Sequence, residues 1–317
     1  MTWRRPILQC ARFSWSFKMT SRPRQLLDFC VLYFLFLVAR PLPRGFLLAA
    51  GRGLGTFVWR VVRFRREIVL DNLRHAFGED MSEREIRGLA HSFYRNLGMT
   101  LMEFLSFPRL QQADFLDLVE IRGLEHFTRI VDQGGGALLV SGHFGNWELM
   151  GARVAAEGQP VSFIVKEQTN SRVDRIQNDI RHRAGIGTIR SGGTSIREMI
   201  RALRRKELIG LVGDQDAGPE GYFTNFLGRQ ASVFRGTAYF AWKLKVPIVT
   251  GFIFRQPDGG HVMEVDPPFA AAPEWDEETA VARLTEIHVA RLEAAIRKAP
   301  DQYFWLHRRW KTRPPGE

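Results

Sequence analysis

The fold of this chain is decided by the stretch Gly134-Gly135-Gly136-Ala137-Leu138-Leu139-Val140-Ser141-Gly142-His143-Phe144-Gly145-Asn146-Trp147-Glu148-Leu149-Met150. Ala137 to Val140 follow three glycines and predict a short, fully buried strand. The strand ends at Ser141-Gly142, and Asn146 is a typical N-cap for a helix that continues through Leu149. Because α/β sheets place their chemistry at the carboxyl ends of buried strands, the turn between strand and helix is the expected functional region.

The turn contains His143, and the first turn of the expected helix contains Glu148. A carboxylate five residues after a histidine can fold back onto the imidazole, fix its tautomer and stabilise the imidazolium that forms on protonation. A bare His-x4-Glu pattern more often marks a core histidine beside an unrelated glutamate. Here the glycine-bounded turn, the preceding strand and the following helix agree, so they favour a catalytic role for His143 with Glu148 as the orienting group.

Composition excludes several classes of protein. Hydrophobic residues make up 45% of the 317 residues, which indicates a substantial core in one large α/β domain or two small ones. The two cysteines, Cys10 and Cys30, form neither a disulfide framework nor a metal cluster and fit a reducing compartment. We expect no metal ion and no other cofactor.

The positive charge is concentrated in the first quarter of the chain. Residues 1–75 hold 14 Lys and Arg against 3 Asp and Glu, a surplus of 11 that accounts for the whole net charge of +11. The same segment holds the longest apolar run, Phe29 to Ala39. Basic residues that flank an apolar run favour an anionic membrane surface over nucleic acid as the partner.

Three regions are expected along the chain. Residues 1–25 are a basic, amphipathic extension, or they reflect a start upstream of Met19. They lack the cleavage site of a removed signal peptide. Residues 26–62 hold two apolar stretches separated by Pro41-Leu42-Pro43, and the first is shorter than the roughly 20 residues that a spanning helix prefers. We expect a membrane-anchoring helix pair that lies in one leaflet, with a single tilted span and a buried helix as alternatives.

The remaining region, 63–317, begins with helices, one of them opened by the capping-box pattern Ser82 to Glu85, and nothing in residues 63–115 demands catalysis. From Val119 strands and helices alternate, which predicts an α/β fold with a central, mostly parallel or mixed sheet flanked by helices. The strands are expected at 161–165, 188–190, 208–212, 246–254 and 261–265, and the helices at 172–184, 277–298 and, from a capping box of Ser195 and Glu198, at 195–203.

Several motifs together resemble a known family. They are Ser141 to Glu148, Val69 to Leu73 with Ala76-Phe77, Gly213 to Asp216, Phe226-Leu227-Gly228, and Gln302 to Lys311. Their order and spacing resemble the lipid A late acyltransferases, of the Kdo-dependent lauroyl and myristoyl type, within the lysophospholipid acyltransferase-like enzymes. The resemblance runs from about Leu26 to the C-terminal region and implies a glycerolipid acyltransferase-like fold, with 63–317 as the acyltransferase domain.

The resemblance implies acyl transfer from a thioester to a hydroxyl, for which a neutral His143 suits the role of general base. No Gly-x-Ser-x-Gly elbow occurs in the chain, so direct transfer is expected rather than a covalent acyl-enzyme. Backbone amides near Gly145 and Asn146, helped by a cationic side chain, would stabilise the oxyanion. Asp214 and Gln215 resemble the Asp-Gln pair that the family places beside its pocket.

Four cationic side chains are candidates for binding the phosphates or sugar acids of the lipid: Lys166, Arg181, Arg183 and Arg190. For each arginine, an ordinary surface residue is the alternative. The run Tyr303 to Lys311 is expected to pack on the core, with His307, Arg308 and Arg309 facing the lipid headgroup or the carrier protein, although an ordinary terminal segment is slightly favoured for these three.

The expected donor is an acyl carrier protein with a fatty acyl thioester, and the expected acceptor is a hydroxyl of a lipid A precursor at the cytoplasmic side of the bacterial inner membrane. One alternative keeps the chemistry with acyl-CoA and a lysophospholipid, ornithine lipid or mannoside. The chain lacks the Glu-Gly-Thr-Arg motif of the glycerolipid branch, which lowers that alternative. A non-catalytic lipid-binding protein is the alternative from another class, and a serine hydrolase is excluded by the missing elbow.

Overall fold

The computed structural model describes residues 22–316, so nearly all of the expected N-terminal extension lies outside the described residues. A seven-stranded sheet forms the centre, in the order β1-β9-β8-β2-β5-β3-β4. Its strands are β1 (Val119–Arg122), β2 (Ala137–Ser141), β3 (Val161–Val165), β4 (Ile186–Arg190), β5 (Leu208–Val212), β8 (Ile248–Arg255) and β9 (His261–Val265). Strands β8, β2, β5, β3 and β4 are parallel, whereas β9 is antiparallel to β8, so the sheet is mixed as predicted.

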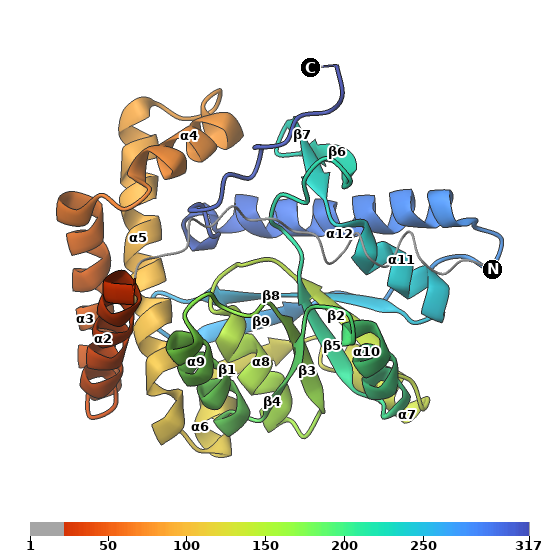
Figure 1. Ribbon diagram of the computed structural model, residues 1–317, viewed down its shortest axis with the longest axis horizontal. Coiled ribbons are helices and arrows are strands. Elements are labelled where there is room, and N and C mark those ends of the chain that lie inside the picture. The colour runs from red at the N-terminus through yellow and green to blue at the C-terminus, as the bar shows by residue number, and fades with distance from the viewer. Residues whose placement is uncertain (1–21, 317) are drawn as a thin grey trace.

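Helices cover both faces of the sheet (Figure 1). The helices on or beside the sheet are α5 (Glu83–Ser106), α6 (Gln112–Leu118), α7 (Glu125–Asp132), α8 (Trp147–Ala156), α9 (Ser171–Arg183), α10 (Ser195–Arg204), α11 (Arg235–Leu244) and α12 (Glu277–Lys298). Successive side chains of β2 point to opposite faces: Leu139 packs with α8 and α9, and Leu138 packs with α10, α11 and α12. Strand β2 is therefore buried on both sides, which explains its continuous apolar sequence.

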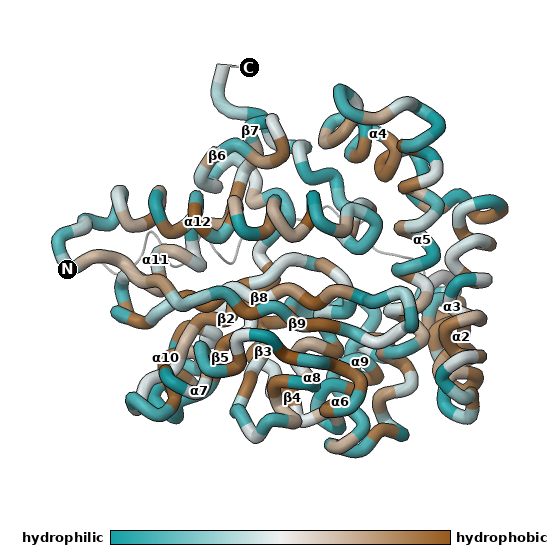
Figure 2. Tube along the Cα trace, turned by 180° about the vertical axis from the view of Figure 1, so that it is seen from behind, coloured by the Kyte–Doolittle hydropathy of each residue, from teal (hydrophilic) through white to brown (hydrophobic). Residues whose placement is uncertain are grey.

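The N-terminal helices form a separate layer beside α5 (Figures 1 and 2). They are α2 (Arg22–Ala39), α3 (Arg44–Phe57), a π-helical turn (Val58–Val62) and α4 (Arg66–Phe77). Helix α3 crosses α5 closely because Gly51 of α3 faces Gly98 of α5: a Cβ on Gly98 would lie 2.1 Å from the carbonyl oxygen of Gly51. A Cβ on Gly55 would likewise lie 2.1 Å from the carbonyl oxygen of Tyr94. Within residues 22–316, no helix has the combination of length and apolarity needed to cross a membrane.

Most of the predicted elements are confirmed, some of them residue for residue, as for β3, β5, β9 and α12. The capping box of Ser82 and Glu85 is also confirmed. The second capping box is wrong, because Thr194 rather than Ser195 precedes α10 and its hydroxyl donates to the Glu198 carboxylate at 2.9 Å. A two-stranded hairpin, β6 (Tyr222–Phe226) and β7 (Arg229–Val233), was not anticipated.

Candidate active site

The candidate site lies where the neighbouring parallel strands β2 and β5 end. Their register pairs Ser141 with Val212, and His143 and Asp214 each follow two residues later. The two side chains meet there: Nδ1 of His143 lies 2.7 Å from Oδ1 of Asp214. The backbone N–H of His143 also donates to Oδ2 at 3.0 Å, so both oxygens of one carboxylate hold one residue.

The charge of Asp214 is fixed by this contact. The carboxyl is buried, with 3% of its side chain exposed, and burial alone would raise its pKa. The adjacent His143 ring and its two hydrogen bonds outweigh burial and lower the pKa of Asp214. An ionised carboxylate only accepts hydrogen bonds, so it selects the tautomer of His143 that carries its proton on Nδ1.

The other ring nitrogen, Nε2, is left for chemistry. No group within residues 22–316 bonds to Nε2, and 23% of the His143 side chain is exposed. Trp147 and Phe304 flank the ring, with centroids 5.1 and 5.7 Å from it. A neutral histidine with an unoccupied Nε2, a buried carboxylate on Nδ1 and aromatic walls can accept a proton from a hydroxyl.

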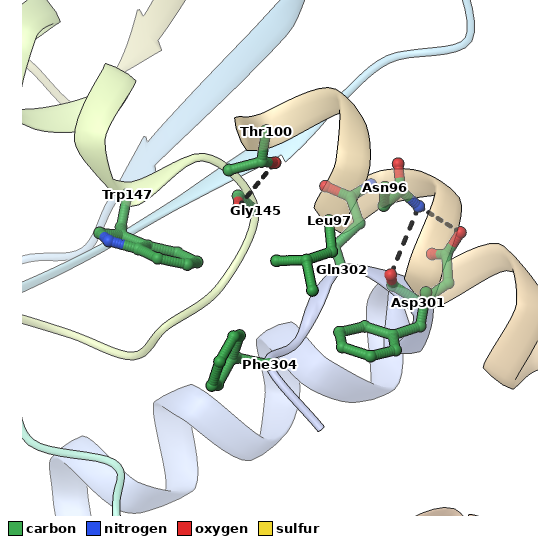
Figure 3. Close-up of a pocket in the computed structure, with 9 residues that line it drawn as sticks. Asn96, Leu97, Thr100, Gly145, Trp147, Asp301, Gln302 and Phe304 are labelled. Atoms are coloured by element: carbon green, nitrogen blue, oxygen red, sulfur yellow. Dashed lines mark hydrogen bonds between the residues drawn. The ribbon is translucent and has the colours of Figure 1, made fainter. Parts of the chain in front are cut away.

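A pocket of about 270 Å³ lies beside this turn and opens to solvent. Figure 3 shows Trp147 and Phe304 on one side of it, and Asn96, Leu97 and Asp301 on the other. Because Trp147 and Phe304 also touch His143, the pocket and the ring share one wall.

Glu148 does not orient His143 in this structure. Its carboxylate instead forms a forked ion pair with Arg181 of α9, in which Nε lies 3.0 Å from Oε2 and one terminal nitrogen lies 2.6 Å from Oε1. Helix α8 turns Glu148 toward α9, whereas the strand order brings Asp214 to the histidine. The expected His143–Glu148 contact is therefore replaced by His143–Asp214.

Of the other expected binding residues, two are buried or largely buried and four lie at or near the surface. Asn146 is fully buried and caps α8 as predicted, accepting from the Leu149 N–H at 3.1 Å. Arg181 is largely buried against Glu148. The remaining candidates lie at or near the surface: Lys166, Arg183 and Arg190 are exposed and Gln215 is half-buried. Arg190 contacts Glu167 at 3.4 Å and Asp174 at 3.6 Å.

One of the backbone amides expected to stabilise the oxyanion is already occupied. The N–H of Gly145 donates to the carbonyl of Gln302 at 2.8 Å, which removes it as an oxyanion donor. Gly145 itself needs a left-handed conformation, with φ at 58°, and a Cβ there would lie 1.9 Å from the Ile253 carbonyl oxygen. The turn is thus fixed by backbone contacts that a spacing motif does not reveal.

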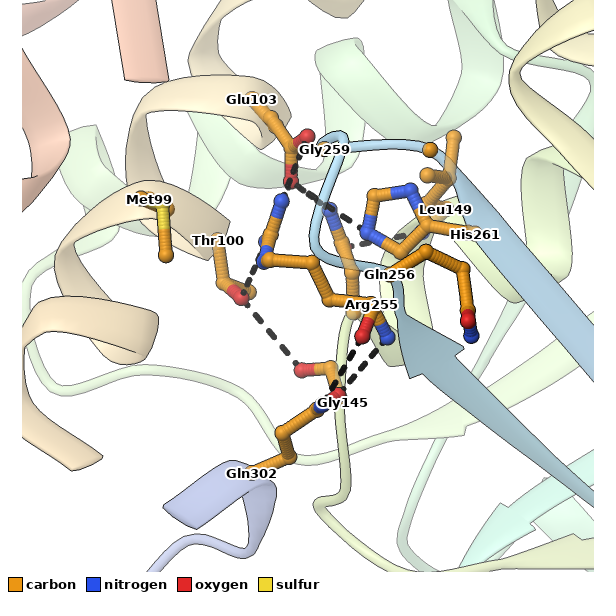
Figure 4. Close-up of polar contacts among 12 residues, drawn as sticks. Met99, Thr100, Glu103, Gly145, Leu149, Arg255, Gln256, Gly259, His261 and Gln302 are labelled. Atoms are coloured by element: carbon orange, nitrogen blue, oxygen red, sulfur yellow. Dashed lines mark hydrogen bonds and ion pairs between the residues drawn. The ribbon is translucent and has the colours of Figure 1, made fainter. Parts of the chain in front are cut away.

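A buried cluster of polar side chains supports the turn, and the sequence did not indicate it. Glu103 of α5 is 2% exposed and accepts from Asn146 Nδ2 at 2.9 Å and from two nitrogens of Arg255 at 2.7 and 2.9 Å. Figure 4 shows this pair together with Thr100, Gly145 and Gln302. Burial alone would raise the pKa of Glu103, but Arg255 and its other cationic neighbours hold it at about 2. Residues 63–115 were expected to contain nothing that demands catalysis, and Glu103 was not singled out because its neighbours along α5 are mostly apolar.

The C-terminal run packs on the core, but its middle residues face inward. Arg309 and His307 are buried, and only Arg308 of the three is exposed. His307 and Arg309 therefore do not face a headgroup or carrier protein, which agrees with the favoured alternative of an ordinary terminal segment. The amide of Asn72 in α4 donates to the carbonyl oxygens of Trp305 and His307 at 2.8 and 2.6 Å. Two motifs far apart in the sequence thus hold one segment over the site.

Comparison with known proteins places the chain in a family. The bacterial lipid A biosynthesis acyltransferase family matches residues 10–312. The chain is 32% identical to a lipid A biosynthesis lauroyltransferase of Escherichia coli over 93% of this chain and 94% of that one. It is 29% identical to a lipid A biosynthesis palmitoleoyltransferase of the same species over 87% and 88% of the two chains.

A solved structure is also similar, the 1-acyl-sn-glycerophosphate acyltransferase of Thermotoga maritima, over 81% of this chain and 98% of that one, at 16% identity and a TM-score of 0.39. The family match and the relatives suffice: the chain belongs to the bacterial lipid A biosynthesis acyltransferases, and it is an acyltransferase.

Proposed function

We propose that this member of the bacterial lipid A biosynthesis acyltransferase family moves a fatty acyl chain from acyl carrier protein to a hydroxyl of a lipid A precursor, with His143 as general base and Asp214 as its orienting carboxylate. The observation that carries the mechanism is the pair of contacts from Asp214 to the ring and backbone of His143. The acceptor is proposed from the family match and from the names of the relatives.

The proposed step is a direct transfer. Nε2 of His143 takes the hydroxyl proton as the oxygen bonds to the thioester carbon. The carbon–sulfur bond then breaks, and the imidazolium returns the proton to the departing thiolate. Asp214 stabilises the imidazolium between these two events. Two N–H groups at the start of α8, those of Trp147 and Glu148, have no bonding partner within residues 22–316 and are our candidates for stabilising the oxyanion in place of Gly145.

The lipid headgroup is proposed to meet the exposed cations at the carboxyl ends of β3 and β4, Lys166 and Arg190, together with Gln215, whereas Arg183 precedes β4 and lies at the opposite edge of the sheet. Arg181 contributes less to anion binding because Glu148 neutralises it. We therefore assign Glu148 and Arg181 a structural role beside the pocket, with Phe104 under the guanidinium at 6.0 Å.

Membrane association is proposed from a set of exposed apolar side chains on the N-terminal elements, which we call the apolar patch. It consists of exposed side chains on α2, α3 and the turn after them: Leu26, Leu27, Val31, Phe34, Leu37, Phe46, Phe57, Val61, Val62 and Phe64. Exposed apolar side chains in such number mark an interaction surface, and arginines beside them suit anionic lipid. We propose that this patch enters one leaflet of the bacterial inner membrane, with the active site on the cytoplasmic side, where the carrier protein is.

The test is acyl transfer by the purified protein in lipid vesicles, with acyl carrier protein and acyl-CoA thioesters offered in parallel and a lipid A precursor or a lysophospholipid as acceptor. Mass spectrometry should find a lipid A precursor with one additional acyl chain, made from the carrier-protein donor by the wild type and not by His143→Ala. A preference for acyl-CoA and a lysophospholipid would assign the alternative substrates. Product from the wild type and His143→Ala at equal rates would overturn the mechanism.

A further inference from the structure

The buried carboxylate of Glu103 lies on a helix far from β2 in sequence, yet it contacts the residue that opens α8. Its Oε2 accepts from Nδ2 of Asn146 at 2.9 Å. This bond orients the amide so that the other end, Oδ1, accepts from the Leu149 N–H at 3.1 Å. One carboxylate therefore determines which way the Asn146 side chain caps the helix.

A second path from Glu103 reaches the same turn. Its oxygens hold the guanidinium of Arg255, and the backbone of Arg255 is joined to the side chain of Gln302 by bonds of 2.8 and 3.1 Å. The carbonyl of Gln302 accepts from the Gly145 N–H at 2.8 Å. Both residues that follow Phe144 are thus held through one anion, one by its side chain and one by its backbone.

The charge balance favours positioning over stability as the purpose of this cluster. Glu103 and Arg255 have side chains 3% and 6% exposed, and removing two such charges from water costs about what their attraction returns. Arg44 of α3, which is 32% exposed, lies 3.1 Å from the same carboxylate as a second cation. His261 lies 3.8 Å from Glu103, but burial lowers its pKa to about 4, so it adds no charge near neutral pH. In some proteins a buried ion pair fixes a geometry that apolar residues of equal size do not fix.

We propose that Glu103 is a positioning residue for acyl transfer: through Asn146 and Arg255 it sets the backbone between His143 and α8, and hence the place of the attacking hydroxyl and the oxyanion relative to Nε2. The inference rests on the proposed function. It predicts that loss of Glu103 lowers the rate of the chemical step without weakening substrate binding, because the carboxylate touches neither substrate.

The test compares Glu103→Gln, Asn146→Ser and the double variant, with concentrations normalised to folded protein. Serine caps a helix but cannot reach Glu103, so Asn146→Ser carries the test even if Glu103→Gln folds poorly. Each single variant should lose about 10- to 100-fold in kcat with KM within about 3-fold of the wild type. The kcat of the double variant should be no lower than that of the more impaired single variant, because both substitutions act on the same contact between residues 103 and 146.

The matched control is Glu157→Gln, which removes the carboxylate partner of the buried Arg153 at the far end of α8. Its kcat should stay within about 2-fold of the wild type. The pH–rate profile supplies the second readout: Glu103→Gln should lower the plateau and leave the acid limb in place, whereas a group acting on the charge of His143 would move that limb.

Two outcomes overturn the inference. They are a kcat for both single variants within about 2-fold of the wild type, and a loss in the double variant equal to the product of the two single losses. Wild type and His143→Ala are assayed alongside. If the wild type makes no product, the proposed function is wrong. If the wild type makes product and His143→Ala does not, a wild-type kcat for both Glu103→Gln and Asn146→Ser contradicts only the positioning role of Glu103.

Discussion

Nδ1 of His143 and Oδ1 of Asp214 lie 2.7 Å apart although 71 positions separate them in the sequence. Their meeting follows from the sheet: β2 and β5 are neighbouring parallel strands in register, and each residue lies two positions past a paired strand end. The catalytic carboxylate we propose is therefore supplied by strand order rather than by spacing along the chain.

Gly145→Ala should disrupt the turn that carries His143. An added Cβ would lie 1.9 Å from the Ile253 carbonyl oxygen, and the φ of 58° is itself unfavourable for alanine. We expect a loss of several kcal/mol in the free energy of unfolding, read from urea denaturation. Gly158→Ala is the matched control, since its φ is 81° but nothing lies within 4 Å of its Cβ, and it should cost about 1 kcal/mol. Equal losses in the two variants would contradict the account of the turn.

Glu148→Gln should destabilise the protein by about 3 kcal/mol, because it leaves the largely buried Arg181 without its ion pair. Adding Arg181→Met removes the unpaired charge and should recover most of the lost free energy of unfolding. Urea denaturation of the single and double variants measures both. A double variant as unstable as Glu148→Gln would show that Glu148 acts through another partner.

Stability should fall between about pH 6.5 and pH 4. Burial lowers the pKa of His261, His288 and His307 to about 4 each, whereas in the unfolded chain the value is about 6.5. The unfolded state then binds more protons in this interval, so stability is full above it and is lost as the pH falls through it. At pH 5 each histidine should cost about 2 kcal/mol relative to pH 7.

The variant His288→Leu isolates one of these contributions. Leucine does not titrate, and Nε2 of His288 is buried without a hydrogen bond among the described residues. Between pH 7 and pH 5, the free energy of unfolding should fall in the wild type and in His288→Leu, and the fall should be about 2 kcal/mol smaller in the variant. An unchanged pH dependence would refute the assignment of His288.

The apolar patch should bind anionic vesicles. Phe34 and Leu37 are 64% and 49% exposed, and burying each in lipid is worth about 2 kcal/mol. Phe34→Glu combined with Leu37→Glu should release the protein in co-sedimentation with vesicles that contain phosphatidylglycerol. Leu116→Glu, on α6 and outside the patch, is the control and should sediment like the wild type. Release of the control to the same extent would show that another surface binds.

What the sequence predicts well here is local. The apolar run of β2, the Asn146 cap and the length of α12 each depend on neighbours within a few positions, and all three are confirmed. Asp214 was placed at a strand end beside the pocket, but its partnership with His143 was not predicted, because pairing of β2 with β5 is a long-range property.

Two other errors have the same origin. Glu148 has the spacing to reach His143, yet the packing of α9 against α8 supplies Arg181 as the nearer partner. Glu103 lies in a helix among apolar residues, and its charge is stabilised by Arg255, Asn146 and Arg44, which come from other segments. The identity of the partner decides the role of each carboxylate.

The most direct measurement is acyl transfer by Asp214→Asn, at equal folded concentration, across a range of pH. The account predicts that kcat falls by about 10³- to 10⁴-fold, because the histidine loses the carboxylate that selects its tautomer and stabilises the imidazolium formed during the reaction. Asp216→Asn is the control, since Asp216 is buried in the same loop but bonds to Thr312, and it should stay within about 10-fold of the wild type. A kcat for Asp214→Asn equal to that of the wild type at every pH would contradict the claim that Asp214 orients the catalytic histidine.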